Sequence, residues 1–182
     1  MNHAAETWAT LVRASVDNKH PWRTPALCTQ GLEGPNARHV VLRKAMPDAA
    51  TLVFYTDRRS QKMRDLEHCN TVSLVFWNPK SNTQLRVWGT ARIENDDVQT
   101  EQYWARVPDH ARRDYATLSA PGSALNASDE QAHDMSLARQ CFTVLLVQVD
   151  RLDCLQLSRL GHLRWGAQRN SQGEWMLQDL VP

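Results

Sequence analysis

The chain lacks the short motifs that mark several widespread kinds of catalytic and binding site. Its 182 residues contain no GxGxxG run, no P-loop and no GxSxG elbow, so dinucleotide, nucleoside-triphosphate and serine-hydrolase sites have no support. The four cysteines are scattered without a CxxC spacing, and no close set of His, Cys, Asp and Glu suggests zinc. We therefore expect no metal site and reduced cysteines.

Long apolar runs and an excess of one charge are also missing. No stretch approaches the roughly 20 apolar residues of a membrane-spanning helix, and the N-terminus lacks the basic and apolar regions of a secretory signal. The formal net charge is +1, which argues against bulk attraction to nucleic acid or to an anionic membrane. We expect a cytoplasmic protein with neither as a partner, folded as one domain over residues 1–182.

What the chain does contain is a series of β-rich runs separated by short polar loops. In one of them Leu85, Val87, Ala91 and Ile93 alternate onto one face, which predicts a strand with one face on a core. Short loops predict antiparallel neighbours, and few inserted helices favour a small antiparallel barrel over a doubly wound sheet. The runs expected to form strands are 37–44, 50–56, 70–77, 83–94, 141–157, 162–165 and 174–180.

Helices are expected at the periphery of this sheet, which makes the fold class β-dominated α+β. Within an N-terminal helical segment at 1–20, Trp8, Leu11, Val12 and Val16 recur at spacings of three and four. A polar composition predicts a flexible loop at 119–134. The other helical regions expected are 60–68 and 96–117, the latter interrupted at Pro108.

The stretch FYTDRRSQKMRDL raises the question of an anion site. Ser60 is a good helix N-cap, which puts Gln61 and Lys62 in the first turn, where free backbone N–H groups favour an anion. Cations oppose the helix dipole at this end, so Arg58, Arg59 and Lys62 crowd there unfavourably unless a negative group binds. The stretch alone leaves two interpretations open, an anion site and a solvated basic loop.

Two tryptophans in the β-rich region have several possible roles. Trp77 and Trp88 can belong to the core, to an oligomer interface or to a platform for a flat ring, and packing is the usual role of tryptophan. Arg86, Trp88 and Arg92 also share one strand face, which leaves a nucleic-acid-binding barrel as an alternative function. Such binding would weaken steeply with salt.

Taken in order, the segments resemble the pyridoxamine 5'-phosphate oxidase-like flavoproteins, the FMN-binding split β-barrel family. The resemblance runs from HPWRTPAL to the C-terminus and is carried by ARHVVLR, FYTDRRSQKMRDL, VSLVFW, TQLRVWGTARIE, EQYWARVP, HLRW and EWMLQDLVP. It implies an antiparallel split β-barrel with peripheral helices, a bound FMN, and a homodimer with FMN at the subunit interface. Apolar residues on outer sheet faces suit such an interface.

The resemblance also implies which residues contact FMN. Arg38 and Lys62 would bind its phosphate, Gln84 would reach the isoalloxazine ring, and Arg164 would contact it from the other subunit. Gln61 stands where the family usually has arginine, so one of the two arginines just before it is a candidate replacement. The cofactor-binding residues expected are Arg38, His39, Val40, Val41, Leu42, Arg43, Tyr55, Thr56, Ser60, Gln61, Lys62, Gln84 and Arg164.

The substrate positions match the family less well. The residues expected to bind substrate are Arg43, Tyr103 and His162. The family's substrate-gripping arginine and serine fall on Val107 and Ala111, and Arg106 would point about 100° away on a helix. A tryptophan that stacks on the flavin falls near Cys154. Losing a charge-assisted contact costs roughly 1.5–3 kcal/mol, so we expect a substrate other than pyridoxamine 5'-phosphate.

These observations support two functions of different kinds. One is an FMN-dependent oxidoreductase that transfers hydride to or from flavin N5, with the redox chemistry supplied by the flavin and its orientation by the protein. Since the flavin carries the chemistry, no dedicated acid–base pair is required and the catalytic residues are unknown. The other function is a non-catalytic protein that holds FMN for storage or sensing.

Overall fold

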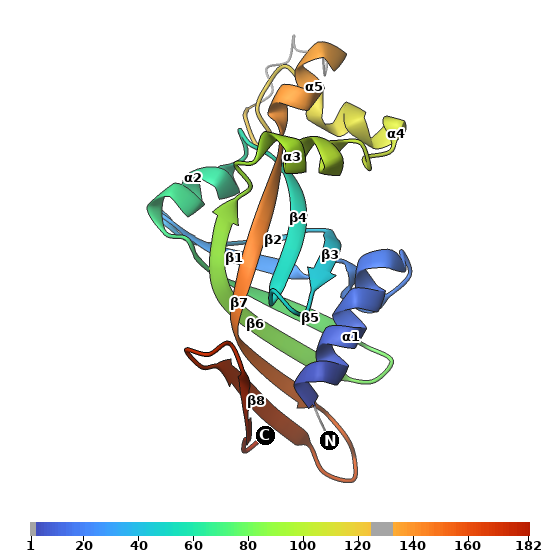
Figure 1. Cartoon of the computed structure of the whole chain (residues 1–182), viewed down its shortest axis with the longest axis vertical. Coiled ribbons are helices and arrows are strands. Elements are labelled where there is room, and N and C mark those ends of the chain that lie inside the picture. The colour runs from blue at the N-terminus through green and yellow to red at the C-terminus, as the bar shows by residue number, and fades with distance from the viewer. Residues whose placement is uncertain (1–2, 125–132) are drawn as a thin grey trace.

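The computed structural model describes residues 3–124 and 133–182. Within them, nine strands form one sheet in the order β2-β1-β5-β6-β7-β4-β3, and β8 and β9 extend it beside β7. All pairings are antiparallel, and β2 and β3 lie at the two ends, so the sheet stays open (Figure 1). The predicted antiparallel split barrel with peripheral helices is confirmed. The strands are β1 (Ala26–Gly31), β2 (Gly34–His39), β3 (Leu42–Met46), β4 (Thr51–Asp57), β5 (Thr71–Asn78), β6 (Thr83–Ile93), β7 (Phe142–Gln156), β8 (Leu163–Arg169) and β9 (Trp175–Asp179).

The long strand β7 connects the two ends of the molecule. Its first half pairs with β4, its second half pairs with β8, and β6 pairs with it from Leu145 to Gln156. The β6–β7 register shifts between Trp88 and Gly89, where a Cβ on Gly89 would lie 2.0 Å from the backbone oxygen of Gln148. Only glycine permits this approach. In Figure 1, β7 runs from the helices at one end to β8 at the other.

Helices cover the sheet at two places. One is the side of the barrel, where α1 packs on β3 and α2 packs on β1. The other is the far end of the molecule, where α3, α4 and α5 gather above β4 and β7 (Figure 1). We call this second group the helical cap. The helices are α1 (His3–Val16), η1 (Pro21–Arg23), α2 (Gln61–His68), α3 (Asp97–Trp104), α4 (Asp109–Arg112), η2 (Arg113–Tyr115) and α5 (Met135–Cys141).

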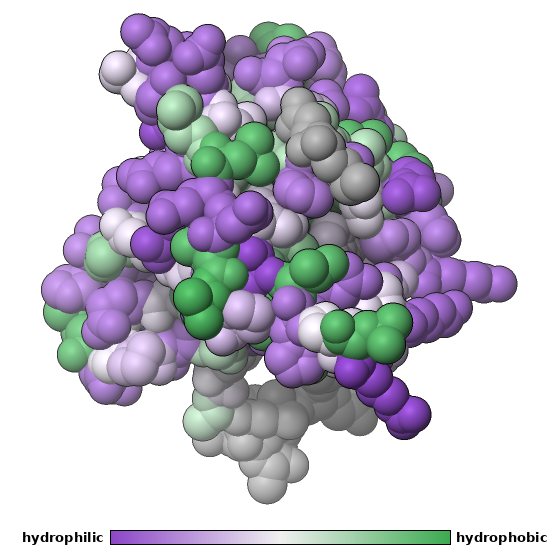
Figure 2. Space-filling view, turned by 90° about the horizontal axis from the view of Figure 1, so that it is seen from below, coloured by the Kyte–Doolittle hydropathy of each residue, from purple (hydrophilic) through white to green (hydrophobic). Residues whose placement is uncertain are grey.

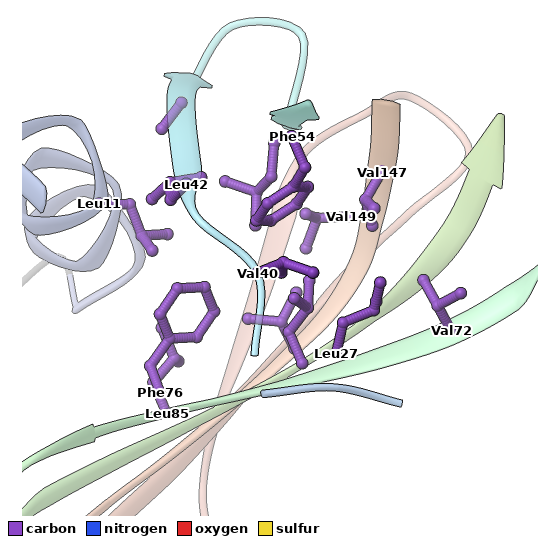
Figure 3. Close-up of a cluster of buried hydrophobic side chains, with 14 of the residues drawn as sticks. Leu11, Leu27, Val40, Leu42, Phe54, Val72, Phe76, Leu85, Val147 and Val149 are labelled. Atoms are coloured by element: carbon purple, nitrogen blue, oxygen red, sulfur yellow. The ribbon is translucent and has the colours of Figure 1, made fainter. Parts of the chain in front are cut away.

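The main core lies between α1 and the inner face of the curved sheet. Figure 3 shows Leu11 of α1 facing Leu42, with Phe54 and Phe76 from separate strands in the same cluster. Each such side chain contributes about 1.5–3 kcal/mol when it is fully buried. A second apolar cluster under the helical cap is centred on Phe142. The predicted inward face of β6 is also confirmed, since its apolar side chains are buried or packed on the core: Leu85, Val87, Ala91 and Ile93.

Some local predictions were wrong. The strand expected at 37–44 is two strands, because the chain leaves the β2 ladder after His39 and enters β3 at Leu42. The strand β1, whose sequence ALCTQG has no clear apolar alternation, was not predicted. In α1, Val12 and Val16 are exposed, at 37% and 76%. Small residues let this helix approach the sheet closely, and its buried face is Ala4, Thr7, Trp8, Leu11, Ala14 and Ser15.

Other local predictions hold, and the predicted loop lies half outside the described residues. The short helix α2 and the break at Pro108, which is the N-cap of α4, are confirmed. The loop predicted at 119–134 includes residues 125–132, which the structure does not describe. Over 3–124 and 133–182, no helix is both long and apolar enough to cross a membrane. The same residues contain no group of three or more His, Cys, Asp and Glu side chains placed to hold a metal ion.

Candidate functional site

The turn between β4 and α2 brings one ammonium group against two hydroxyl groups. Lys62 Nζ donates to Thr56 Oγ1 at 2.8 Å and to Ser60 Oγ at 3.0 Å. Thr56 lies near the end of β4 and Ser60 is the N-cap of α2, and both are buried. We call Thr56, Ser60, Lys62 and the first-turn N–H groups of α2 the anion niche, because positive charge and free donors converge there.

The N-cap residue of α2 has an unexpected role. Ser60 has the extended backbone of an N-cap, as predicted, but its side chain makes no capping hydrogen bond. Its hydroxyl instead meets Lys62 and lies 3.4 Å from Thr56 Oγ1. The N–H groups of Gln61 and Lys62 are therefore not satisfied by the Ser60 side chain and remain suited to an external acceptor, whereas Met63 N–H donates to the Ser60 backbone oxygen at 3.0 Å.

The ammonium group of Lys62 lies in an environment that favours its neutral form. Burial lowers the pKa of Lys62, and the nearby charge of Arg38 lowers it further, while Asp57 and Asp65 act weakly in the opposite direction. Among the described residues, its hydrogen-bond partners are the two hydroxyl groups. An anion at this position would offset the cost of burying the charge.

A second cation, Arg38, lies beside a fully buried carboxylate. Arg38 Nη2 and Thr29 Oγ1 donate to Asp65 Oδ2 at 3.1 and 2.6 Å, and Gln61 Nε2 donates to Asp65 Oδ1 at 3.0 Å. Burial raises the pKa of Asp65, but hydrogen bonds from Thr29, Gln61 and Arg38, together with the Arg38 charge, outweigh it and lower the pKa overall. Asp65 is therefore ionised and holds Arg38 in place.

The two arginines before Ser60 do not reach the anion niche. Arg59 donates to both carboxylate oxygens of Asp57, with Nη2 at 2.7 Å from Oδ2. Arg58 Nη2 donates to the backbone oxygen of Phe142 at 3.4 Å. Neither guanidinium group replaces the cation that is missing at Gln61. The predicted crowding of charge is also relieved, because Asp57 neutralises Arg59.

The segment expected to lie along the flavin crosses from β2 to β3. Val40 and Leu42 point into the core, so only their backbone can face a ligand. Val41 and Arg43 alternate to the other side and are half-buried, and His39 is exposed at the end of β2. Val41 lies between the two strands, where its backbone is free of a β-ladder.

Two of the three residues expected to bind substrate share one aromatic cluster. The Arg43 guanidinium lies 5.2 Å from the ring centroid of Tyr55, which lies 5.9 Å from the ring of Tyr103. Burial raises the pKa of both Tyr55 and Tyr103, so the phenols are neutral donors. In the described part of the chain, Arg43 Nε is buried without a hydrogen-bond partner.

Two residues close to Tyr103 in the sequence bear on the expected substrate positions. Val107 is buried in the helical cap and has no role in binding an anion. Arg106, which was expected to point elsewhere, lies close enough for its charge to lower the pKa of Tyr55 and of Tyr103.

The two site residues late in the chain lie at the opposite end of the molecule from the cap. Arg164 donates to Asp153 Oδ2 at 2.9 Å, and the same oxygen accepts from Arg86 at 2.7 Å. His162 precedes β8, is exposed, and borders with Arg164 a cavity of about 310 Å³. Tyr103 lies in α3, so a single chain does not bring it to His162 (Figure 1).

The outward face of β6 carries Gln84, Arg86 and Trp88. Gln84 is half-buried at the beginning of the strand. Guanidinium groups of Arg151 and Arg86 lie over the Trp88 ring, 3.8 and 5.0 Å from its centroid, and Arg86 is also ion-paired to Asp153. Since these cations and the ring already bind one another, this face gives little support to the nucleic-acid alternative.

Comparison with known proteins identifies the family. Residues 5–95 match the family model described as pyridoxamine 5'-phosphate oxidase, FMN-binding domain, and the chain belongs to this family. A pyridoxine/pyridoxamine 5'-phosphate oxidase of Anaeromyxobacter dehalogenans is 33% identical over 103 residues, or 56% of this chain and 50% of that protein. The chain thus spans about half the length of this relative. An oxidase of the same name, numbered 2, from Arabidopsis thaliana is 25% identical over 96% of both chains.

Two solved structures share the fold over nearly the whole chain. A pyridoxamine 5'-phosphate oxidase-related, FMN-binding protein of Nostoc punctiforme has a TM-score of 0.73 and 24% identity, covering 100% of this chain and 97% of its own. PhzG of Burkholderia lata, in complex with tetrahydrophenazine-1-carboxylic acid, has a TM-score of 0.74 and 19% identity, covering 99% and 91%. At these identities the likeness establishes the fold alone.

The donor set of the anion niche fits the phosphate of the family's cofactor. A phosphate monoester offers several acceptor oxygens, and the niche offers an ammonium group, two hydroxyl groups and helix N–H groups. Sequence reasoning missed the two carboxylates that bind the arginines of the site, Asp65 and Asp153. The contact between Gln61 and Asp65 could have been predicted, because the two residues lie four apart on one helix. The contacts of Asp153 with Arg86 and Arg164 could not, because they depend on the pairing of β6, β7 and β8.

Proposed function

We propose that this protein binds FMN, with the phosphate in the anion niche. The observation that supports this most strongly is Lys62, a largely buried ammonium group that has two hydroxyl partners in the described structure and whose pKa is lowered. Arg38 adds a second cation from β2. Family membership makes FMN the phosphate ligand to test first.

We further propose that the bound flavin acts in an oxidoreductase reaction. FMN would supply hydride transfer at N5, and the chain would hold and orient it. Gln84 and the backbone of 39–42 would face the isoalloxazine ring. Arg43, whose side chain is half-buried, would hold a polar substrate near the ring through its guanidinium group, with Tyr103 as a neutral donor beside it.

The substrate is proposed to differ from pyridoxamine 5'-phosphate. Val107 is buried among apolar neighbours, and Ala111 has no polar side chain, so neither can grip a phosphate. Each lost charge-assisted contact weakens binding by about 1.5–3 kcal/mol. The same observation favours the second candidate function, a protein that binds FMN without turnover.

A homodimer is proposed to complete the site. Arg164 and His162 lie too far from Tyr103 to join it within one chain, whereas a second copy could bring them together (Figure 1). The β8–β9 end also exposes apolar side chains, which a partner would cover. Figure 2 views this end and shows apolar patches among polar ones. The exposed apolar residues there are Leu157, Leu160, Leu163, Met176, Leu177 and Val181.

The colour of the purified protein tests FMN binding. We expect a yellow protein with flavin absorbance, and we expect the flavin-free protein to regain it on addition of FMN. A colourless protein that does not bind added FMN would overturn the proposal. Anaerobic bleaching by candidate reductants, followed by reoxidation with candidate acceptors, separates the two functions, since the non-catalytic protein would respond to neither.

A further inference from the structure

We propose that Asp65 is a positioning residue that sets the preference of the site for a phosphorylated flavin by holding Arg38 toward the phosphate. The inference rests on the proposed FMN function and assigns a role to a residue that would not touch the cofactor. Asp65 lies on α2, and its side chain is fully buried, whereas 24% of the Arg38 side chain is exposed. The carboxylate is thus an internal anchor for a cation that faces outward.

The carboxylate of Asp65 accepts hydrogen bonds from several neighbouring side chains. Oδ2 accepts from Arg38 at 3.1 Å, Thr29 at 2.6 Å and Asn36 at 3.3 Å, and Oδ1 accepts from Gln61 at 3.0 Å. These donors come from β1, β2 and α2. An arginine that keeps one orientation loses less conformational entropy when it binds a ligand.

Gly31 shows how closely the backbone packs on this carboxylate. A Cβ at position 31 would lie 2.6 Å from Asp65 Oδ1 and 3.1 Å from Asn36 Nδ2. Any side chain there must push the carboxylate away from its donors. Gly31→Ala therefore disturbs the anchor while every polar group of the site is retained.

Two opposing effects decide what the carboxylate does to an anion. Its negative charge repels a phosphate, but Arg38 and three neutral donors already compensate that charge. The carboxylate accepts from Arg38 Nη2 and from the Thr29 hydroxyl, which in turn accepts from Arg38 Nη1. Because the charge is compensated and the carboxylate holds Arg38 both directly and through Thr29, we expect positioning to dominate.

The test compares FMN with riboflavin, which lacks the phosphate. For the flavin-free full chain, the ratio of the riboflavin Kd to the FMN Kd measures the preference for phosphate. Asp65→Asn should lower this ratio about tenfold, the loss of one charge-assisted contact, with little change in the riboflavin Kd. An unchanged ratio would overturn the inference, and so would a higher one, which would mean that repulsion dominates.

A double-mutant cycle shows whether Asp65 acts through Arg38. In an Arg38→Ala background, Asp65→Asn should change the ratio less than about threefold. An equally large change in both backgrounds would contradict the inference and indicate a general structural role. Glu101→Gln removes a carboxylate that is paired 2.7 Å from Arg139 in the helical cap, and it should leave the ratio unchanged.

Two further variants keep the inference testable if Asp65→Asn does not fold. Thr29→Val removes a hydroxyl that joins Asp65 and Arg38, and Gly31→Ala displaces the carboxylate. Both should lower the ratio in the same direction, and an unchanged ratio in both would refute the role of Asp65. A wild-type chain that binds neither flavin, or that binds both equally, would instead refute the proposed phosphate site itself.

Discussion

The anion niche and the β8–β9 end differ in how completely one chain builds them. In the niche, Lys62, Thr56 and Ser60 already touch one another, and Asp65 fixes Arg38 beside them. At the β8–β9 end, Arg164 is held by Asp153, but several apolar side chains around it are exposed among polar ones. One region is organised for a small charged ligand, and the other has the properties of a surface that needs a partner.

This difference indicates that, in the proposed function, the niche binds the phosphate and the β8–β9 end forms the dimer. Electrostatic and hydrogen-bonding groups in the niche act over short distances within one chain, so they can bind a phosphate whatever the oligomeric state. The β8–β9 end would contribute residues to the site only after two copies associate, because these residues lie at the opposite end of the molecule from Tyr103 (Figure 1). Phosphate binding and dimerisation should therefore be separable by mutation.

The largest expected effect is the loss of the niche cation. Lys62→Ala should weaken FMN binding by about 1.5–3 kcal/mol, which is about tenfold or more, because it removes a charged phosphate contact. Arg38→Ala should weaken it by at least about 1.5 kcal/mol. Titration of flavin-free protein by flavin fluorescence measures both effects.

Arg58→Ala is the matched control for these variants. Its guanidinium binds the backbone oxygen of Phe142 rather than the niche, so FMN affinity should stay within about twofold of wild type. Wild-type affinity in both the Lys62 and the Arg38 variants would mean that the phosphate binds elsewhere. A large effect of Arg58→Ala would mean that its side chain turns inward when FMN is present.

The next largest effect should be the loss of dimerisation through the β8–β9 end, with the anion niche left intact. Leu163→Glu places a charge on an exposed apolar residue of β8, with 65% of it exposed in the single chain. If a second copy covers it, burying the unpaired carboxylate should shift the protein from dimer to monomer in sedimentation experiments. Leu32→Glu, in the exposed β1–β2 turn, is the control and should not change the oligomeric state. A wild-type monomer, or a Leu163→Glu dimer of unchanged stability, would argue against this surface as the interface.

The pH dependence of FMN binding should show a smaller effect that belongs to the niche. Burial and Arg38 lower the pKa of Lys62 below its ordinary value of 10.5. A bound phosphate favours the charged lysine, so FMN binding should take up a proton and weaken as pH rises through the lowered pKa, by at most tenfold per pH unit for one proton. Calorimetry in buffers of different ionisation enthalpy measures that proton. Riboflavin binding should show no such uptake, and equal behaviour of the two flavins would rule out Lys62 as the source.

The smallest expected effect comes from restoring the family's usual residue at position 61. Gln61→Arg adds a cation in the first turn of α2, but Asp65 lies four residues on and would pair with it. We expect FMN binding to tighten by no more than about 1 kcal/mol, and the gain should shrink with added salt. The same titration series at two salt concentrations measures it, and a tenfold loss of affinity would show that Gln61 is required as it stands.

The fold was largely predictable because its signals are local. The alternation of β6, the Ser60 N-cap position and the break at Pro108 are each written in a few adjacent residues. The β2–β3 break at Val40 and Val41 was not predictable in this way, since an apolar run looks the same whether it continues one strand or connects two. The single-domain organisation stays a prediction.

The sequence predicted which residues gather at the candidate site, but it did not predict which of them contact one another. The sequence indicated that Lys62 lies in a first helical turn beside Ser60, and that basic residues crowd there. It could not show that Arg59 pairs with Asp57 or that Arg58 reaches Phe142, because either arginine could equally have turned inward. The roles of the cofactor-binding and substrate-binding residues stay predictions that the mutants above test.

By itself, the sequence determined the strand alternation and the position of the anion niche in the chain, because these depend on neighbours within a few residues. It also indicated the family, through the order of several segments along the chain. The tertiary structure decided which charges are free and which are neutralised. Asp65 meets Arg38 across 27 residues, and Asp153 meets Arg86 across 67. Such ion pairs form only when elements distant in sequence pack together, and burial then strengthens their Coulomb attraction by excluding water.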